Sequence, residues 1–280
     1  MQLKDIMPSR DGKVAVVAYL ISIVSFFVMV VEEVDWWAIP LVEGVAYFIM
    51  ILIIDVKIVQ VIFIVHSLGL VFSVGGLIAV SDHPFSSFGV YMMAMSFFHW
   101  SEYVTTAIFN PSTLSLDSFL INHSWEYGVA ACASWLEFWV EYYFFPGLKT
   151  LRIFFWVGLV MVVLGETLRK VAMFTAGSNF THQVQNVKRP NHSLVTTGVY
   201  SLFRHPSYVG WFYWSIGTQI LVFNPVCSVG YAIVTWMFFR ERIEEEEKLL
   251  LWFFGDEYSQ YKEKVGTGIP FLPGYKHKTS

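Results

Sequence analysis

Most of the chain consists of apolar runs separated by short polar segments. A helix needs about 20 predominantly apolar residues to cross a hydrocarbon core of about 30 Å. Eight runs meet or approach this length. They cover approximately Val14–Val31, Trp36–Ile54, Ile58–Val80, Phe85–Phe109, Gly128–Phe145, Leu151–Phe174, Tyr208–Phe223 and Val226–Phe239. Because backbone groups in lipid must be paired within the protein, the pattern predicts an all-α integral membrane protein with about eight transmembrane helices.

The last two runs are shorter than the other six. About 15 residues rising 1.5 Å each cover roughly 22 Å, which is less than the hydrocarbon core. Only Asn224 and Pro225 separate the two runs, and proline is well placed in the first turn of a helix. We therefore predict a tight helical hairpin over residues 208–239.

The segment from Thr175 to Pro206 is the longest polar stretch between apolar runs. Connections of this length are usually functional or disordered. Because this one leads into the densest cluster of reactive side chains, we interpret it as functional. The sequence thus predicts two regions: transmembrane helices 1–6 over residues 1–174, and a functional region over residues 175–280. The second region comprises the polar loop, the hairpin, and a C-terminal helix and tail.

The composition supports a membrane protein and argues against several other classes. Hydrophobic residues make up 55% of the chain and charged residues 14%, whereas a soluble domain carries about 25% charged residues. The net charge of −4 makes nucleic acid an unsuitable partner. Cys132 and Cys227 lie far apart in apolar runs. We therefore expect two inert buried thiols, with neither a disulfide framework nor a metal site.

The basic residues predict an orientation in the membrane. With the N-terminus in the cytosol and loops alternating, all of the 18 lysines and arginines except Lys149 and Arg152 fall on the cytosolic side. This distribution agrees with the positive-inside rule. Both termini, and with them the C-terminal helix, are therefore expected to be cytosolic.

A first cluster of reactive side chains covers residues 198–211, with the sequence GVYSLFRHPSYVGW. Pro206 disfavours helix at His205 and can begin a new helix, so His205 is expected at a helix start. Free backbone N–H groups at such a start favour an anionic group. Gly210 would allow a ligand or a neighbouring helix to approach closely.

A second cluster follows the last apolar run, over residues 240–252, and contains four consecutive glutamates. Helical spacing places Arg242 and Glu246 one turn apart on the apolar side. Ionisable groups that face a bundle interior are costly and usually functional. Glu244 and Glu247 are expected to point away from that side into solvent, which makes them suitable control positions.

Together these clusters resemble the isoprenylcysteine carboxyl methyltransferases, a family of endoplasmic reticulum enzymes. The resemblance is strongest over residues 180–272. The RHPxYxG pattern also recurs in other membrane methyltransferases and, in looser form, in sterol reductases, so the longer matches are more specific. The matching stretches are Leu194–Tyr200, Arg204–Trp211, Arg240–Glu247 and Phe254–Tyr258 together with Tyr261.

The resemblance implies the reaction and the roles of individual residues. S-adenosylmethionine would donate a methyl group to the α-carboxylate of a C-terminal prenylated cysteine in CaaX-processed proteins, such as small GTPases. Arg242 would be the catalytic, substrate-binding residue, and we also assign Trp211 to the substrate. The residues assigned to the cofactor are Gln185, His192, Ser193, Leu194, Val195, Tyr200, His205, Pro206, Ser207, Tyr208 and Glu246.

The available side chains suit this chemistry. A carboxylate has a reference pKa near 4, so it is already a nucleophile at neutral pH and needs no general base. Catalysis would come from holding the carboxylate oxygen and the methyl carbon about 3–3.5 Å apart and in line. Arg242 can hold a carboxylate through two parallel hydrogen bonds. The aromatic faces of Tyr200, Tyr208 and Trp211 suit a sulfonium cation.

Three other functions remain open on the sequence. A membrane sterol reductase would use NADPH and transfer hydride. A phospholipid-headgroup methyltransferase would differ only in substrate. A non-enzymatic transporter would show an internal inverted repeat, which the sequence lacks. The sequence also lacks a Gly-rich dinucleotide loop, a Walker motif and a nucleophile elbow. The prenylcysteine methyltransferase is therefore the favoured prediction.

Overall fold

The computed structural model describes residues 9–31, 55–121, 124–190 and 192–275. The regular elements among these residues are all helices, which confirms the all-α prediction for the described part of the chain. The chain divides into two compact units, Met1–His123 and Ser124–Ser280. The predicted apolar run Trp36–Ile54 lies almost entirely outside the described residues.

The first unit contains α1 (Arg10–Val31), α3 (Val56–Ala79) and α4 (Ser86–Phe109), which pack against one another. Tyr19 of α1 stacks on Trp100 of α4, with ring centroids 4.6 Å apart. Among the described helices, α3 alone has the length and apolar composition of a membrane span. The count of eight spans therefore stays a prediction.

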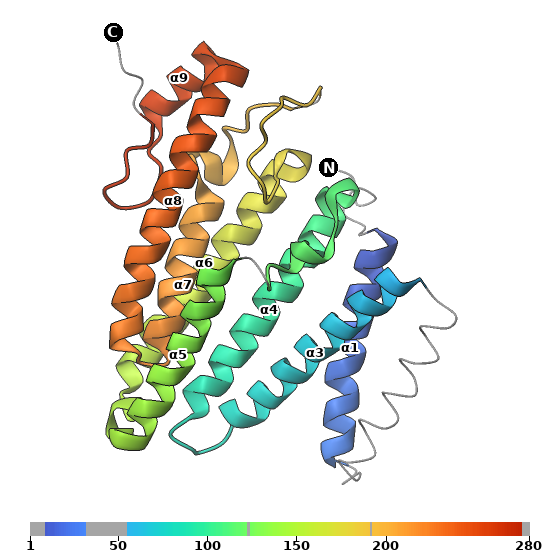
Figure 1. The fold of residues 1–280 in the computed structure, drawn as a ribbon, viewed down its shortest axis with the longest axis vertical. Coiled ribbons are helices and arrows are strands. Elements are labelled where there is room, and N and C mark those ends of the chain that lie inside the picture. The colour runs from blue at the N-terminus through green and yellow to red at the C-terminus, as the bar shows by residue number, and fades with distance from the viewer. Residues whose placement is uncertain (1–8, 32–54, 122–123, 191, 276–280) are drawn as a thin grey trace. The chain divides into compact units, whose positions relative to one another are not determined.

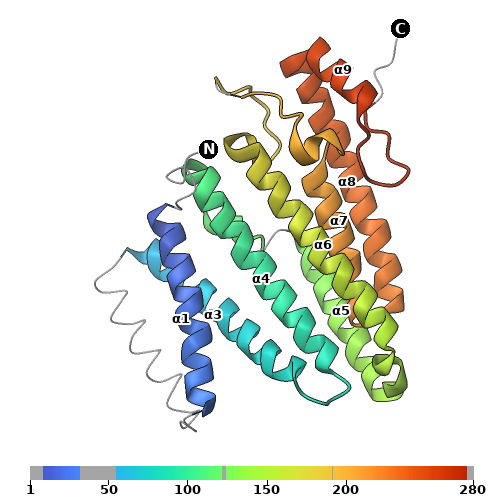
Figure 2. The ribbon, with the colours of Figure 1, turned by 180° about the vertical axis from the view of Figure 1, so that it is seen from behind.

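The second unit contains α5 (Trp125–Phe144), α6 (Arg152–Ala176), α7 (Pro206–Leu221), α8 (Pro225–Phe254) and α9 (Asp256–Lys264). Helices α6 and α7 lie side by side in both views (Figures 1 and 2). They touch through glycines, because a Cβ at Gly165 would meet the backbone of Gly210 and Trp214. The close approach predicted at Gly210 is thus made by a neighbouring helix.

Helices α7 and α8 form the predicted tight hairpin, and Pro225 lies in the first turn of α8. Two polar side chains, the buried Lys149 and the half-buried Glu137, complete the turn between them. Lys149 donates to the backbone oxygens of Val222 and Phe223 at 3.0 and 2.9 Å. Glu137 accepts from the first free backbone N–H groups of α8. These contacts satisfy the unpaired groups that the two helix ends would otherwise leave.

Helix α8 continues the last apolar run without a break for 30 residues. At about 1.5 Å per residue it spans roughly 45 Å, which is longer than a hydrocarbon core. It ends at Gly255, whose φ of 53° is in the region that favours glycine. Helix α9 follows directly and closes this end of the unit (Figure 1).

The two cysteines differ in their surroundings. Cys227 is buried as expected, but Cys132 is exposed on α5, so the expectation of a second buried thiol was wrong. Lipid is as apolar as a protein core. An apolar run in a membrane protein therefore does not show which of its side chains face the interior.

Candidate active site

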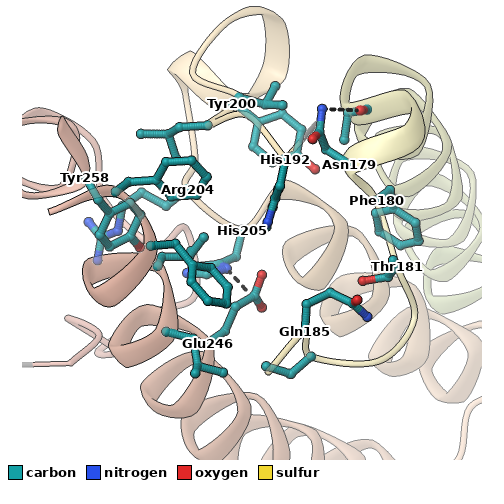
Figure 3. A pocket seen from close by; sticks show the side chains of 18 of the residues that line it. Asn179, Phe180, Thr181, Gln185, His192, Tyr200, Arg204, His205, Glu246 and Tyr258 are labelled. Atoms are coloured by element: carbon teal, nitrogen blue, oxygen red, sulfur yellow. Dashed lines mark hydrogen bonds and ion pairs between the residues drawn. The ribbon is translucent and has the colours of Figure 1, made fainter. Parts of the chain in front are cut away.

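One cavity in the second unit gathers the residues that the sequence assigned to the cofactor. Its walls come from the polar loop after α6, the short turn Gly198–Ser201, the start of α7 and the last turns of α8 (Figure 3). All eleven predicted residues line it, although they are spread over more than sixty positions of sequence. They are Gln185, His192, Ser193, Leu194, Val195, Tyr200, His205, Pro206, Ser207, Tyr208 and Glu246.

The start of α7 has the geometry that the proline predicted. Pro206 occupies the first turn, and His205 precedes it with non-helical angles of φ −124° and ψ 57°. The His205 ring is buried and lies parallel to the Tyr208 ring, with centroids 5.5 Å apart. This stacking fixes the imidazole at the edge of the cavity.

Glu246 provides a carboxylate within the cavity. It accepts a 2.6 Å hydrogen bond from the Tyr208 hydroxyl. It also lies 3.8 Å from His205 Nδ1 (Figure 3). Its side chain is 30% exposed, so an oxygen remains accessible to a bound molecule. A carboxylate in this position can receive a cationic or N–H donor group.

Arg242 and Trp211 do not line the cavity. Arg242 Nε donates to the Tyr208 hydroxyl at 3.0 Å, and its Nη2 donates to the backbone oxygen of His182 in the polar loop. The Trp211 ring lies 5.8 Å from the Phe239 ring. The two residues predicted to meet the substrate therefore lie between α7 and α8, on the side of Tyr208 away from the cavity. Arg242 also contacts the polar loop.

The polar loop is held to its neighbours by several hydrogen bonds. Asn179 and Ser193 bond to each other through two contacts of 3.1 and 3.3 Å. Lys188 donates to the backbone oxygen of Phe253 at 2.7 Å and lies over the Phe254 ring. The loop thus closes over the cavity from the α6 side and is attached to the end of α8.

His192 has a free ring nitrogen at the cavity. Its Nδ1 atom is buried and has no hydrogen-bond partner among the described residues. Burial lowers the pKa of His192, and the positive charges of Arg189 and Lys188 lower it further. The ring is therefore neutral at pH 7 and can bond to a ligand at that nitrogen.

Two tyrosines of the cavity wall stay protonated. Burial, followed by the charge of Glu246, raises the pKa of Tyr200. Burial, followed by the charge of Glu247, raises the pKa of Tyr258, which the sequence analysis had not singled out. Both hydroxyls are therefore neutral and can act as hydrogen-bond donors.

The burial of Glu247 contradicts the expectation that this residue faces solvent. Its side chain is fully buried, and it pairs with Arg204 at 2.8 Å and Lys262 at 2.8 Å. It lies four residues after the fully buried Ile243, so it belongs to the flank of α8 that the C-terminal tail covers. Glu244 is exposed as expected and pairs with Arg240.

The charge balance around Glu247 keeps it ionised. Burial alone would raise the pKa of Glu247, but hydrogen bonds from His205 and Lys262 and the charge of Arg204 lower it to about 2. The positive charge of the buried Arg204 and the negative charge of Glu247 thus compensate each other.

The structure adds cavity residues that sequence reasoning missed. They come from the polar loop, from the last turns of α8 and from α9, and helical spacing from Glu246 could have indicated those on α8. They are Asn179, Phe180, Thr181, Leu249, Leu250, Phe253, Phe254 and Tyr258. Within the described residues no group of three or more His, Cys, Asp or Glu side chains is placed to hold a metal ion.

Comparisons with known proteins agree on one family. Residues 156–252 match the model of the isoprenylcysteine carboxyl methyltransferase (ICMT) family. The human protein-S-isoprenylcysteine O-methyltransferase is 60% identical over 209 residues, 75% of this chain and 74% of the human one. Its Xenopus laevis counterpart is 48% identical over 278 residues, 95% of this chain and 96% of the relative.

A solved structure gives the same result for the fold. The eukaryotic intramembrane Ras methyltransferase ICMT superposes with a TM-score of 0.89 and 45% sequence identity, over 96% of this chain and 100% of that one. This chain therefore belongs to the isoprenylcysteine carboxyl methyltransferase family of membrane enzymes.

Proposed function

We propose that this protein methylates the C-terminal α-carboxylate of prenylated cysteine, with S-adenosylmethionine as the methyl donor. The observation that carries the proposal is the convergence of the eleven predicted cofactor residues on one cavity, with Arg242 on the far side of Tyr208. The substrates are CaaX-processed proteins, including small GTPases of the Ras type.

The cavity suits a polar cofactor that carries an amino group, a sulfonium and a heteroaromatic base. The accessible Glu246 carboxylate suits the amino group. The unpartnered Nδ1 of His192 offers a hydrogen bond to a polar edge. Aromatic faces such as that of Tyr208 suit a sulfonium cation. When bound, this cofactor supplies an electrophilic methyl group.

The residues behind Tyr208 suit the other substrate. Trp211, Phe238 and Phe239 form an aromatic cluster beside Arg242. Burial of a prenyl chain in such a lipid-like environment contributes about 0.8 kcal/mol per CH₂ group. The guanidinium holds the carboxylate oxygen in position, and no residue has to remove a proton from it, because the carboxylate is already ionised at pH 7.

We also propose a multi-pass location in the endoplasmic reticulum membrane, with both termini in the cytosol. The distribution of lysine and arginine supports this orientation. It places the cavity at the cytosolic membrane face, where a water-soluble cofactor and a membrane-bound lipid can meet.

Methyl transfer by the purified protein tests the function directly. We expect incorporation of tritium from S-adenosyl[methyl-³H]methionine into N-acetyl-S-farnesylcysteine, and none into N-acetylcysteine, which lacks the lipid. We also expect S-adenosylmethionine, and not NADPH, to raise the melting temperature. Absence of transfer, together with protection by NADPH, would favour a sterol reductase instead.

A further inference from the structure

Glu247 is a buried carboxylate at which three parts of the second unit meet. It accepts hydrogen bonds from Arg204 Nε at 2.9 Å, Lys262 Nζ at 2.8 Å and the backbone N–H of Tyr275 at 2.8 Å. The His205 ring nitrogen Nε2 lies 3.3 Å from the same carboxylate. These partners belong to the start of α7, to α9 and to the C-terminal segment, which we define as residues 267–275.

Arg204, the ion-pair partner of Glu247, connects the same three parts of the chain through its own hydrogen bonds. Its guanidinium donates to the backbone oxygens of Lys262, Val265 and Pro273, in addition to pairing with Glu247. Arg204 is 6% exposed. The buried ion pair thus binds the start of α7 to the end of α9 and to the C-terminal segment.

The C-terminal segment is shaped to fit against the carboxylate. Gly274 has a φ of +83°, and a Cβ atom there would overlap the Glu247 carboxylate. The Tyr275 carbonyl accepts from Lys262, and Trp236 donates to the Pro270 carbonyl at 2.8 Å. The segment is therefore packed closely onto α8 and α9.

Neither Glu247 nor the C-terminal segment lines the cavity, whereas Arg204 and His205 both do. We propose that Glu247 is a positioning residue for the cofactor, and that the C-terminal segment supports the cofactor site from outside, because it holds Arg204 directly and His205 through Glu247. This inference rests on the proposed methyltransferase function.

The physical reason is the position of His205 in the chain. It precedes α7 with non-helical backbone angles, and its ring is held by stacking on Tyr208 and by its contact with the Glu247 carboxylate. Loss of the Glu247 charge would leave Arg204 and Lys262 without their buried counter-charge, which is strongly unfavourable. The start of α7 would then shift, and the cofactor would bind more weakly while the aromatic cluster behind Tyr208 stayed in place.

Two pairs of matched variants of the full-length protein test this inference. Glu247→Gln is compared with Glu244→Gln, because Glu244 lies on the same helix in an exposed ion pair. Gly274→Ala is compared with Gly266→Ala, because a Cβ at Gly266 has open space. KM for S-adenosylmethionine and KM for N-acetyl-S-farnesylcysteine are measured separately, and cofactor Kd is measured by calorimetry.

We expect Glu247→Gln and Gly274→Ala to raise cofactor KM and Kd by about tenfold or more, which corresponds to a loss of about 1.4 kcal/mol of binding free energy per tenfold change. KM for the farnesylcysteine should change by less than about twofold, and both control variants should resemble the wild type. If Glu247→Gln does not give a monodisperse protein, Gly274→Ala decides, since it leaves every charge in place.

Unchanged cofactor KM and Kd in a folded Gly274→Ala variant would overturn the inference. So would an equal rise in both KM values, or a fall in kcat alone, because either would indicate a general structural role. A wild-type protein that transfers no methyl group would instead refute the proposed function itself, which separates the two failures.

Discussion

The Tyr208 hydroxyl donates a 2.6 Å hydrogen bond to the Glu246 carboxylate. The same hydroxyl accepts from Arg242 at 3.0 Å, so it links the cavity to the proposed substrate side. Helical spacing predicts that Arg242 and Glu246 lie one turn apart, and the Tyr208 phenol bonds to both. This arrangement lets one carboxylate face the cofactor while one guanidinium faces the substrate.

Replacing Tyr208 by phenylalanine should weaken cofactor binding more than lipid binding. The ring that stacks on His205 and Phe239 stays, but Glu246 and Arg242 lose their shared partner. Since loss of one partner of a buried hydrogen bond costs about 1–3 kcal/mol, we expect weaker S-adenosylmethionine binding and a smaller effect on lipid binding. Calorimetry on the folded variant measures both. Unchanged cofactor affinity would contradict the assignment.

His205→Ala should also weaken the cofactor more than the lipid. The imidazole lines the cavity and packs parallel to Tyr208, so its removal opens the cavity edge and leaves Glu247 with one contact fewer. We expect a raised KM for S-adenosylmethionine and little change in KM for farnesylcysteine. An equal rise in both values would count against a cofactor role.

Arg242→Ala should remove nearly all activity while S-adenosylmethionine still binds, because Arg242 lies outside the cavity lining. Arg242→Lys should rescue poorly, since an ammonium cannot reproduce a planar two-point contact with a carboxylate. Activity assays and calorimetry on the same preparations separate the two effects. Near-normal turnover of Arg242→Ala would exclude the substrate-clamp role.

Glu244→Ala is the appropriate control for the α8 variants. Its side chain is 42% exposed and pairs with the exposed Arg240, and such surface pairs contribute about 0–1 kcal/mol. Activity should stay close to that of the wild type. A Glu244→Ala variant as inactive as Arg242→Ala would show that the helical-face argument is wrong.

Acid should destabilise the protein through Glu247. The pKa of this carboxyl is about 2 in the folded protein, below its ordinary value of 4.5. A lowered folded-state pKa contributes stability that is fully present above the unfolded value and is lost as pH falls toward the folded value. Between about pH 4.5 and 2 the melting temperature of the wild type should therefore fall more steeply than that of Glu247→Gln. If the melting temperatures of the two proteins, measured in the same detergent, fell in parallel with pH, Glu247 would not be the source of the acid sensitivity.

The proposed topology can be tested with a protease. Tags at the N-terminus and the C-terminus should both be digested in sealed microsomes, because the basic residues place both ends in the cytosol. A lumenal marker protein provides the control for intact vesicles. Protection of either tag would refute the orientation.

Several features of the site follow from local sequence and could be predicted. Proline disfavours helix at the residue before it and fits the first turn of a new helix, and α7 begins at Pro206 as expected. Helical spacing alone put Arg242 and Glu246 on one side of α8. Both bond the same tyrosine of α7, which is consistent with that placement. Residue type and spacing were sufficient because each of these features depends on neighbours within a turn or two.

The surroundings of Glu247 were decided by tertiary structure. Its partners lie 43, 42, 15 and 28 residues away along the chain, and no helical period reports on contacts at such separations. Glu244 and Glu247 belong to one uniform run of glutamates, yet one is exposed and the other is fully buried. The difference arises because the C-terminal segment folds back onto one flank of α8. Arg204 from the start of α7 and Lys262 from α9 reach the same carboxylate, which makes its burial possible.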